Sequence, residues 1–286
     1  MQQLTLDSNQ RWNHGRASYR LPRETIRKTD YDVALTPDDT TARAFVVQHH
    51  YSRSVPAMRY RVGLYRHGRL VGVAIFSHPC SDAVLTNTFP VSPLEAVELG
   101  RFVLTDDEPG NAESFFLGRA FALIARQGIR GVVSFADPFP RTDLTGNSVL
   151  IGHTGTIYQA HNGIYLGRAT PRTLHLLLDG RVLTIAASQR FAVVNVAGTL
   201  PPSNSRPSDS PHLRPGRRIA PWLRHALDTV TRRVRQPGCH KYAWPLAHAL
   251  RHSLPPSLPY PKHPDTPPQT NGSEFSVCQN SCSFVQ

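Results

Sequence analysis

Apolar residues recur with strand-like and helical spacing through the first two thirds of the chain. Alternating or continuous apolar runs bounded by Gly, Pro or Asp are typical of strands, whereas apolar positions three and four residues apart are typical of an amphipathic helix. The segment 111–128 has the helical spacing, and Gly128 is a usual helix end. His67-Gly68 joins two apolar runs and predicts an antiparallel hairpin.

The predicted elements follow the order β, α, β, β, β, α, β, α, β, β. Helices are expected within 40–52, 111–128 and 155–162, and strands within 31–39, 59–66, 69–79, 97–105, 129–138, 163–169 and 173–184. In the last of these segments, Asp179-Gly180 marks a second hairpin. This order indicates an α/β protein whose mixed, mostly antiparallel central sheet is flanked by helices on both faces.

The composition changes near residue 200, where proline becomes frequent and the apolar pattern weakens. The chain therefore divides into five predicted parts, which are a mobile N-terminal arm (1–28), a compact domain (29–200), a linker (201–215), a basic amphipathic helix followed by an aromatic and proline-rich clasp (216–262), and a disordered tail (263–286).

Arginine dominates the charge of the chain. There are 29 Arg and 3 Lys against 20 acidic residues, which gives a net charge of +12. Between residues 206 and 262, 11 basic residues face 2 Asp, a net of +9. Such a segment can neutralise phosphates and release their counterions, so double-stranded DNA is the expected partner and a solvated basic surface is the alternative. The expected DNA contacts are Arg217, Arg218, Arg224, Arg232, Arg233, Arg235 and Lys241.

Other sequence signals point to a soluble cytoplasmic protein. The N-terminus lacks the apolar centre of a secretory signal, and no apolar run approaches the length of a membrane span. The four cysteines lack zinc-finger spacing and are interpreted as reduced thiols. The pattern indicates no membrane partner and no particular oligomeric state.

Two polar clusters follow or interrupt apolar elements early in the chain. "HHYSRS" places His50 and Tyr51 at a helix end, where a histidine can cap carbonyls or act as a general base or metal ligand. In "VELGRF", Glu98 and Arg101 are three residues apart, which predicts side chains on opposite faces of a strand. Arg101 then needs another anion such as Asp137, and a structural ion pair and a substrate clamp both remain open.

Two further clusters lie later in the chain. "PGNAES" opens the long helix with Asn111 as N-cap and Ser114 in the first turn, where backbone N–H groups can bind a phosphate. "SFADP" places Ser134 and Asp137 at the end of a buried strand, just before "GTIYQAHN". In a short helix there, Tyr158 would share a face with Asn162 and could reach a ligand bound beside Asp137.

The order of these motifs resembles the Mom-like family of bacteriophage DNA-modification proteins. The resemblance runs from about residue 30 to residue 262 and rests on "HHYSR", "PGNAESFFLGRAF", "IRGVVSFADP", "GTIYQAHNGIYLG", "HKYAWPL" and "LPYPK". It implies a GNAT-like acyltransferase fold, so the compact domain at 29–200 would be catalytic.

The resemblance also implies an enzyme that places a carbamoylmethyl (acetamido) group on the N6 amine of adenine in DNA, which protects phage DNA from restriction. The implied donor is acetyl-CoA or a related molecule, held near Asn111 and Ser114. The implied site residues are His50, Tyr51, Arg101, Ser114, Ser134, Asp137 and Tyr158. Because the adenine amine is a poor nucleophile, it needs an activated donor and a base, for which Asp137 and His50 are the candidates.

Two hypotheses follow from the same residues. His50, Asp137 and Tyr158 offer the nitrogen and oxygen ligands that suit a redox-active iron. The alternative functions are a GNAT-like N-acyltransferase that acts on a small-molecule or protein amine, and a DNA-binding relative without catalysis. Salt-dependent DNA binding separates the first alternative from the other readings.

Overall fold

The main sheet of the computed structural model runs through the whole domain. The structure describes residues 9–13, 16–20, 24–183 and 231–262. Within them, seven strands form one sheet in the order β10-β13-β7-β6-β5-β4-β3. Their bounds are β3 Tyr31–Leu35, β4 Met58–Arg66, β5 Arg69–Ser77, β6 Ala96–Leu104, β7 Gly131–Ala136, β10 Ile164–Arg168 and β13 His240–Pro245. All neighbouring pairs are antiparallel except β6 and β7, which are parallel.

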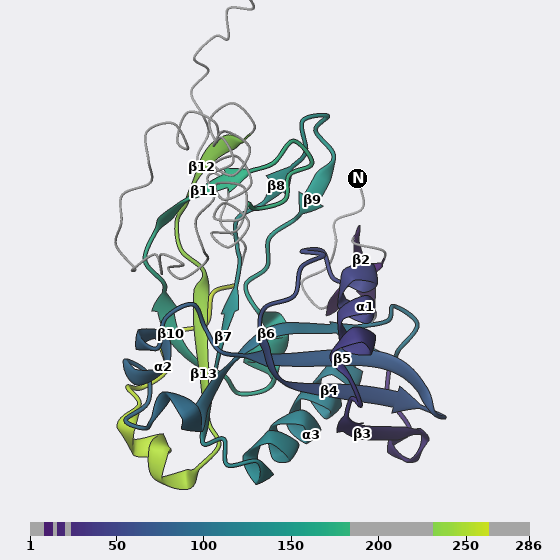
Figure 1. Cartoon of the computed structure of the whole chain (residues 1–286), viewed down its shortest axis with the longest axis vertical. Helices are drawn as coiled ribbons and strands as arrows, with labels where there is room; N and C mark the ends of the chain where they lie inside the picture. Colours follow the sequence, from purple (N-terminus) through teal and green to yellow (C-terminus); the bar gives the residue numbers. More distant parts are fainter. Residues whose placement is uncertain (1–8, 14–15, 21–23, 184–230, 263–286) are drawn as a thin grey trace, which may run out of the picture.

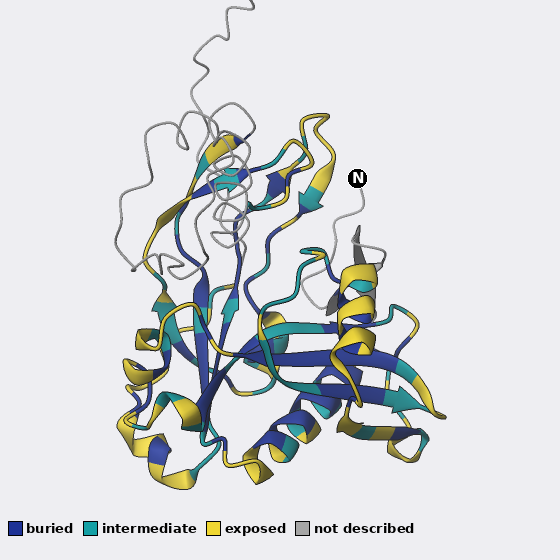
Figure 2. Ribbon diagram, viewed as in Figure 1, coloured by how far each residue is buried: buried dark blue, intermediate teal, exposed yellow. Residues whose placement is uncertain are grey.

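Helices cover both faces of this sheet (Figure 1). On one face, α3 (Ala112–Arg126) packs Phe116, Leu117 and Ile124 into a core that includes Phe76 and Val132. On the other face, α1 (Asp39–His49) packs its buried residues against β5 and β6. This core consists of Ala42, Phe45, Val46, Val73, Ile75 and Val103. The central strands are therefore buried on both sides, and β5 is almost entirely buried in Figure 2, which explains its nearly continuous apolar run.

Short elements complete the domain. A second small core lies under α2 (Ala83–Thr86) and η3 (His248–Ser253), next to η2 (Pro93–Glu95). The helix α4 (Thr156–Ala160) precedes β10, and η1 (Lys28–Asp30) precedes β3. The α/β class with a mostly antiparallel sheet flanked by helices is thus confirmed.

The N-terminal segment differs from the mobile arm expected for residues 1–28. Its described residues include a hairpin of β1 (Asn9–Asn13) and β2 (Arg16–Arg20). The hairpin is held against the domain because the side chain of Arg11 is 3% exposed and forms an ion pair with Glu113 of α3. Sequence periodicity does not detect a segment that is held by one buried side chain.

Residues 232–245 also differ from prediction. The basic helix expected there is a strand, β12 (Arg232–Gln236), which pairs with β11 (Arg172–Leu176). The clasp expected next supplies β13, which lies between β7 and β10 inside the main sheet. Tyr242 and Trp244 pack on the α3 face of the sheet and Ala243 packs on the other face, as the alternation of a strand requires. The segment is too short for this alternation to be recognised in the sequence.

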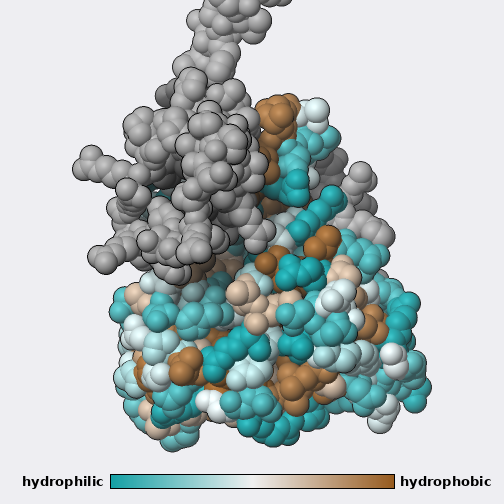
Figure 3. Space-filling view, viewed as in Figure 1, coloured by the Kyte–Doolittle hydropathy of each residue, from teal (hydrophilic) through white to brown (hydrophobic). Residues whose placement is uncertain are grey.

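Several predictions lie outside the described residues, namely the linker at 201–215, the tail at 263–286, most of the basic helix, and Arg217, Arg218 and Arg224. None of the helices described in the structure is long and apolar enough to cross a membrane. On the face shown in Figure 3, hydrophobic residues form separate areas among hydrophilic ones.

Candidate functional site

The parallel strands β6 and β7 separate partway along their length. They pair only from Ala96↔Gly131 to Glu98↔Val133. Beyond that point, the hydroxyl of Ser134 donates a 2.9 Å hydrogen bond to the carbonyl of Leu99 and bridges the start of the gap. The two strands then diverge, which opens a pocket at their carboxyl ends, the usual position of ligand sites in α/β sheets.

A β-bulge in β6 directs Arg101 into this pocket. Ile75 pairs with Arg101 but the next residue, Phe76, pairs with Leu99, so Gly100 is the extra residue. The prediction that Glu98 and Arg101 lie on opposite faces is wrong for this reason. Burial lowers the pKa of Arg101, and electrostatic interactions with Tyr51 and Glu98 partly oppose that shift.

The guanidinium of Arg101 is oriented by the loop after α1. Its Nε donates to the carbonyl of Ser54 at 2.7 Å, and a terminal nitrogen donates to the hydroxyl of Ser54 at 3.0 Å. The other terminal nitrogen donates to the carbonyl of Gly100 at 2.5 Å. These bonds use three of the five N–H groups of a guanidinium. Within the described residues, two N–H groups remain to bind an acceptor in the pocket.

Tyr158 forms the opposite wall. It lies on α4, whose N-cap residue, Gly155, has a positive φ of 80°. Tyr158 is 7% exposed, and its hydroxyl lies close to Ser134. Burial raises the pKa of Tyr158, so the phenol is neutral at ordinary pH.

His50 and Tyr51 line the pocket from the end of α1. Their rings lie 4.2 Å apart between centroids. Nδ1 of His50 accepts the backbone N–H of Ser52 at 3.1 Å, which assigns the ring proton to Nε2. Burial, followed by the charges of Arg101 and His153, lowers the pKa of His50. His50 is therefore neutral, and its one basic nitrogen is already bonded.

Sequence reasoning missed His153, which also lines the pocket. Burial is the main reason why its pKa is lowered to about 4. Its ring centroid lies 6.3 Å from that of Tyr51, edge to face. The segment between β9 (Ser148–Leu150) and α4 carries no periodic pattern, so no sequence signal marks this histidine. The pocket is lined by Arg11, His50, Tyr51, Gly100, Arg101, Phe102, Val103, Leu104, Glu113, Phe135, His153, Thr156, Ile157 and Tyr158.

Asp137 lies just beyond β7 and outside this lining. Its Oδ1 accepts from the backbone N–H of Phe139 at 3.1 Å and from the amide of Gln236 at 3.0 Å. Its Oδ2 lies 3.1 Å from a guanidinium nitrogen of Arg141. Its backbone carbonyl accepts from the N–H of His153 at 2.9 Å. The carboxylate thus connects β7, β8 (Arg141–Thr142) and β12. Ser134, earlier on β7, lies instead beside Tyr158.

The predicted donor site at the start of α3 is occupied by the chain itself. Asn111 makes no side-chain cap, and its Oδ1 accepts the backbone N–H of Ile26 at 2.9 Å. The carboxylate of Glu24 accepts the N–H of Gly110 at 3.1 Å. Ser114 is half-buried and lies outside the pocket lining.

The carbonyl groups of the same loop bind the positive charge of Arg11. Its guanidinium donates to the carbonyls of Thr105, Asp106, Glu108 and Pro109, and it binds both carboxylate oxygens of Glu113, at 2.5 and 2.9 Å. A loop whose carbonyls converge on a cation does not suit a pyrophosphate. Acetyl-CoA anchored at this loop therefore does not fit the residues present.

Iron does not fit the residues named for it either. The oxygens of Asp137 and Nδ1 of His50 are already bonded to other groups. In the part of the chain that the structure describes, no group of three or more His, Cys, Asp or Glu side chains could hold a metal ion.

The predicted DNA contacts within the described residues separate into two places. Arg232, Arg233 and Arg235 are exposed on β12. Lys241 is half-buried on β13, where Nζ donates to the hydroxyl of Thr88 at 2.6 Å and burial lowers its pKa. Lys241 therefore serves the packing of α2, away from β12.

One family model matches most of the chain. The model of the Mom protein family matches residues 30–262, which include every element of the main sheet. The chain belongs to the Mom protein family. A comparison with curated proteins finds no match.

Solved structures resemble parts of this Mom-family chain. A GNAT family N-acetyltransferase (YhbS) from Escherichia coli, in complex with CoA, is 14% identical over 41% of this chain and 68% of its own, with a TM-score of 0.28. A ribosomal-protein-S5-alanine acetyltransferase from Vibrio fischeri is 9% identical over 55% and 90%, with a TM-score of 0.34. An N-acetyltransferase from Staphylococcus aureus Mu50 is 12% identical over 53% and 93%, with a TM-score of 0.32. These scores are low, and nothing about substrate or donor follows from them.

Proposed function

We propose that this Mom-family chain is a transferase that modifies the exocyclic N6 amine of adenine in double-stranded DNA, placing a carbamoylmethyl group that protects the DNA from restriction. The observation that carries the proposal is the ring of aromatic and imidazole side chains around Arg101 in the gap between β6 and β7. Family membership supports it, because the sequence motifs of this pocket are those that resemble the DNA-modifying family.

The pocket suits a flat, neutral heterocycle. A base inside a duplex must leave the stack before its amine can react, and aromatic side chains repay part of that cost by stacking. Tyr51 and Tyr158 supply such surfaces. Their raised pKa values keep both phenols neutral, so they do not repel an uncharged base. Arg101 holds an oxygen or ring nitrogen with its remaining N–H groups.

His153 is the residue that we assign to the proton. The N6 nitrogen forms its new bond to the methylene carbon of the donor while the bond from that carbon to the leaving group breaks, and the leaving group keeps the electron pair. The adenine nitrogen becomes strongly acidic as it bonds, so an imidazole with a pKa of about 4 suffices to take the N6 proton. Asp137 then acts as a positioning residue, since its backbone carbonyl holds the N–H of His153.

The donor enters from a direction other than the start of α3. Glu24 and Arg11 fill that position, so a carbamoylmethyl donor that carries its leaving group on the methylene carbon would bind with that carbon in the pocket and its leaving group elsewhere. Arg101 and Arg11 both line the pocket that the donor carbon would enter.

Protection of DNA tests the proposed function. Plasmid is prepared from cells that express the full chain, from cells that express His153→Gln and from cells without the gene, and is digested with restriction endonucleases whose sites contain adenine. We expect resistance with the wild-type chain alone. An N-acyltransferase of small molecules or proteins would leave all three plasmids equally sensitive, and that result would refute the proposal.

A further inference from the structure

Strands β11 and β12 form a two-stranded ribbon that continues the β10–β13 pair beyond the main sheet. Arg168 pairs with His240 in the sheet, and the N–H of Ala169 then donates to the carbonyl of Cys239 at 2.8 Å. The ribbon itself begins at Arg172, opposite Gln236. Figure 1 shows it projecting from one end of the molecule. We call these two strands the arginine ribbon.

The joint between sheet and ribbon is fixed by a glycine. Gly238 has a φ of 105°, and a Cβ at this position would lie 2.0 Å from the carbonyl oxygen of Ala169. A residue with a side chain at this position would therefore push the backbones at Gly238 and Ala169 apart. The ribbon base is also held by Gln236, whose amide donates to Asp137. The direction of the ribbon relative to the pocket is set by these two contacts.

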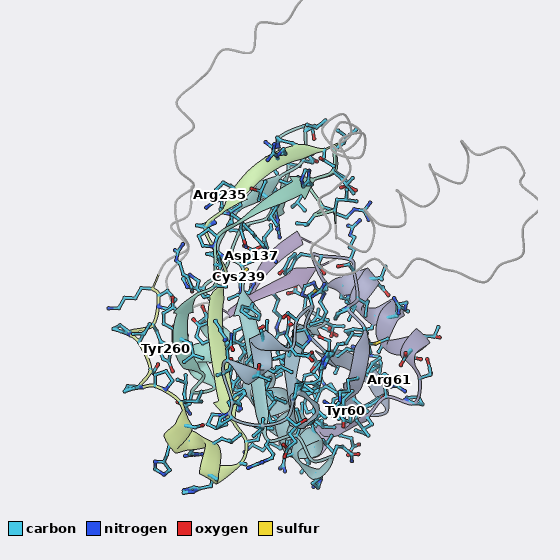
Figure 4. All side chains as sticks on the ribbon, turned by 60° about the vertical axis from the view of Figure 1, so that its left-hand side comes forward. Tyr60, Arg61, Asp137, Arg235, Cys239 and Tyr260 are labelled. Atoms are coloured by element: carbon cyan, nitrogen blue, oxygen red, sulfur yellow. The ribbon has the colours of Figure 1, made fainter. Side chains whose placement is uncertain are left out.

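The two faces of the arginine ribbon differ in character. Leu174, Leu176 and Gln236 are buried on the inner face. The outer face carries Arg233 opposite His175 and Arg235 opposite Thr173, since directly paired residues of antiparallel strands share a face. Figure 4 labels Arg235 on the ribbon and Asp137 at its base.

The arginine ribbon carries positive charge that no described acidic residue on its own strands offsets. The two strands contain four arginines and no acidic residue. Arg172 donates to the side-chain oxygen of Gln236, and Arg232 donates to the carbonyl of Thr142. Within the described part of the chain, no carboxylate forms an ion pair with Arg233 or Arg235. Charges of one sign held on a rigid element without counter-charges fit a polyanion.

We propose that the arginine ribbon enters the major groove of the DNA duplex, with Arg233 and Arg235 directed at phosphates and base edges. The proposal rests on the proposed function and names the element that holds its substrate. A two-stranded β-ribbon fits the major groove, which is about 12 Å wide in B-DNA. The same groove of an RNA duplex is too narrow for side chains to read.

The ribbon also lies where a flipped base would need it. Gln236 at its base binds Asp137, and Asp137 binds the backbone of His153 in the pocket wall. The base of the ribbon is thereby joined to the pocket wall, and a duplex held by the ribbon would lie near the pocket. This juxtaposition gives the pocket access to a base that leaves the same duplex.

Salt dependence of DNA binding tests this proposal. The affinity of a fluorescent DNA duplex for the full chain is measured over a range of salt concentrations, for the wild type and for Arg233→Gln/Arg235→Gln. Loss of two phosphate contacts should reduce the slope of log Kd against log salt by roughly two, and weaken binding on the order of tenfold. The charge-matched control Arg119→Gln/Arg126→Gln, on the exposed face of α3, should leave the slope unchanged.

Other outcomes separate the ribbon from the proposed function. If the wild type protects plasmid DNA while the ribbon variant keeps the wild-type salt slope, the ribbon proposal is wrong and the function stands. If an RNA duplex competes as well as DNA does, insertion into the major groove is wrong. If the wild type binds DNA through the ribbon but protects no plasmid, the proposed function fails alone. Equal melting temperatures of the variants show that folding is intact.

Discussion

The side-chain amide of Gln236 donates a 3.0 Å hydrogen bond to the carboxylate of Asp137, and this bond joins the arginine ribbon to the end of β7. Gln236 is fully buried and also contacts the sulfur of Cys239 at 3.0 Å. Removing a hydrogen-bond donor from a buried carboxylate lowers the free energy of unfolding, because the acceptor is left unsatisfied away from water. The contact therefore couples the position of the ribbon to that of the pocket.

Replacing this amide should cost stability and activity together. In Gln236→Leu, Asp137 loses one donor, and we expect the free energy of unfolding to fall by about 1–3 kcal/mol. Protection of plasmid DNA should fall further than DNA affinity, because the outer arginines stay in place. Urea unfolding and plasmid digestion measure the two effects. Gln48→Leu on the exposed side of α1 is the control, and equal behaviour of the two variants would contradict the coupling.

The Arg11–Glu113 pair should be among the strongest stabilising contacts of the N-terminal hairpin. Arg11→Met leaves the carboxylate of Glu113 buried without its partner, so we expect a loss of about 3–5 kcal/mol in the free energy of unfolding. Adding Glu113→Gln should recover part of that loss, because the unpaired charge disappears. Urea unfolding of the single and double variants measures it. Additive losses would show that the two side chains are not coupled.

The lowered pKa of His153 predicts acid sensitivity. Its folded pKa of about 4 lies below the value of about 6.5 in the unfolded chain, so the unfolded state binds more protons between these pH values. Stability is complete above about pH 6.5 and falls as pH drops toward 4, by up to about 3 kcal/mol from this group. In His153→Gln, the difference in stability between pH 7 and pH 4 should be smaller. An unchanged difference in urea unfolding would place His153 in solvent.

Much of the fold was predictable because the apolar residues of its strands and helices recur with clear periodicity. The turn at His67-Gly68 has positive φ at both residues, 48° and 79°, as the hairpin signal requires. The long helix from Ala112 also ends next to Gly128, as predicted. These features depend on neighbours in the sequence, so local patterns suffice.

The remaining features depend on contacts between distant segments. The bulge at Gly100 is defined only by the register with β5, and without it Glu98 and Arg101 are assigned to the wrong faces. Arg11 and Glu113 are 102 residues apart. Of the predicted site residues, His50, Tyr51, Arg101 and Tyr158 line one pocket, while their individual roles stay predictions.

The central claim is that the pocket around Tyr158 modifies adenine, and the nucleosides of DNA from expressing cells test it most directly. Tyr158→Phe removes a hydroxyl beside Ser134 in the pocket, whereas Tyr260→Phe removes one that donates to the carbonyl of Gly163, outside the pocket lining. Each change should cost only about 1 kcal/mol of stability. By mass spectrometry, we expect a mass-shifted deoxyadenosine with the wild type and Tyr260→Phe, and its loss with Tyr158→Phe. Unmodified deoxyadenosine with the wild type, or full modification with Tyr158→Phe, would contradict the assignment of this pocket.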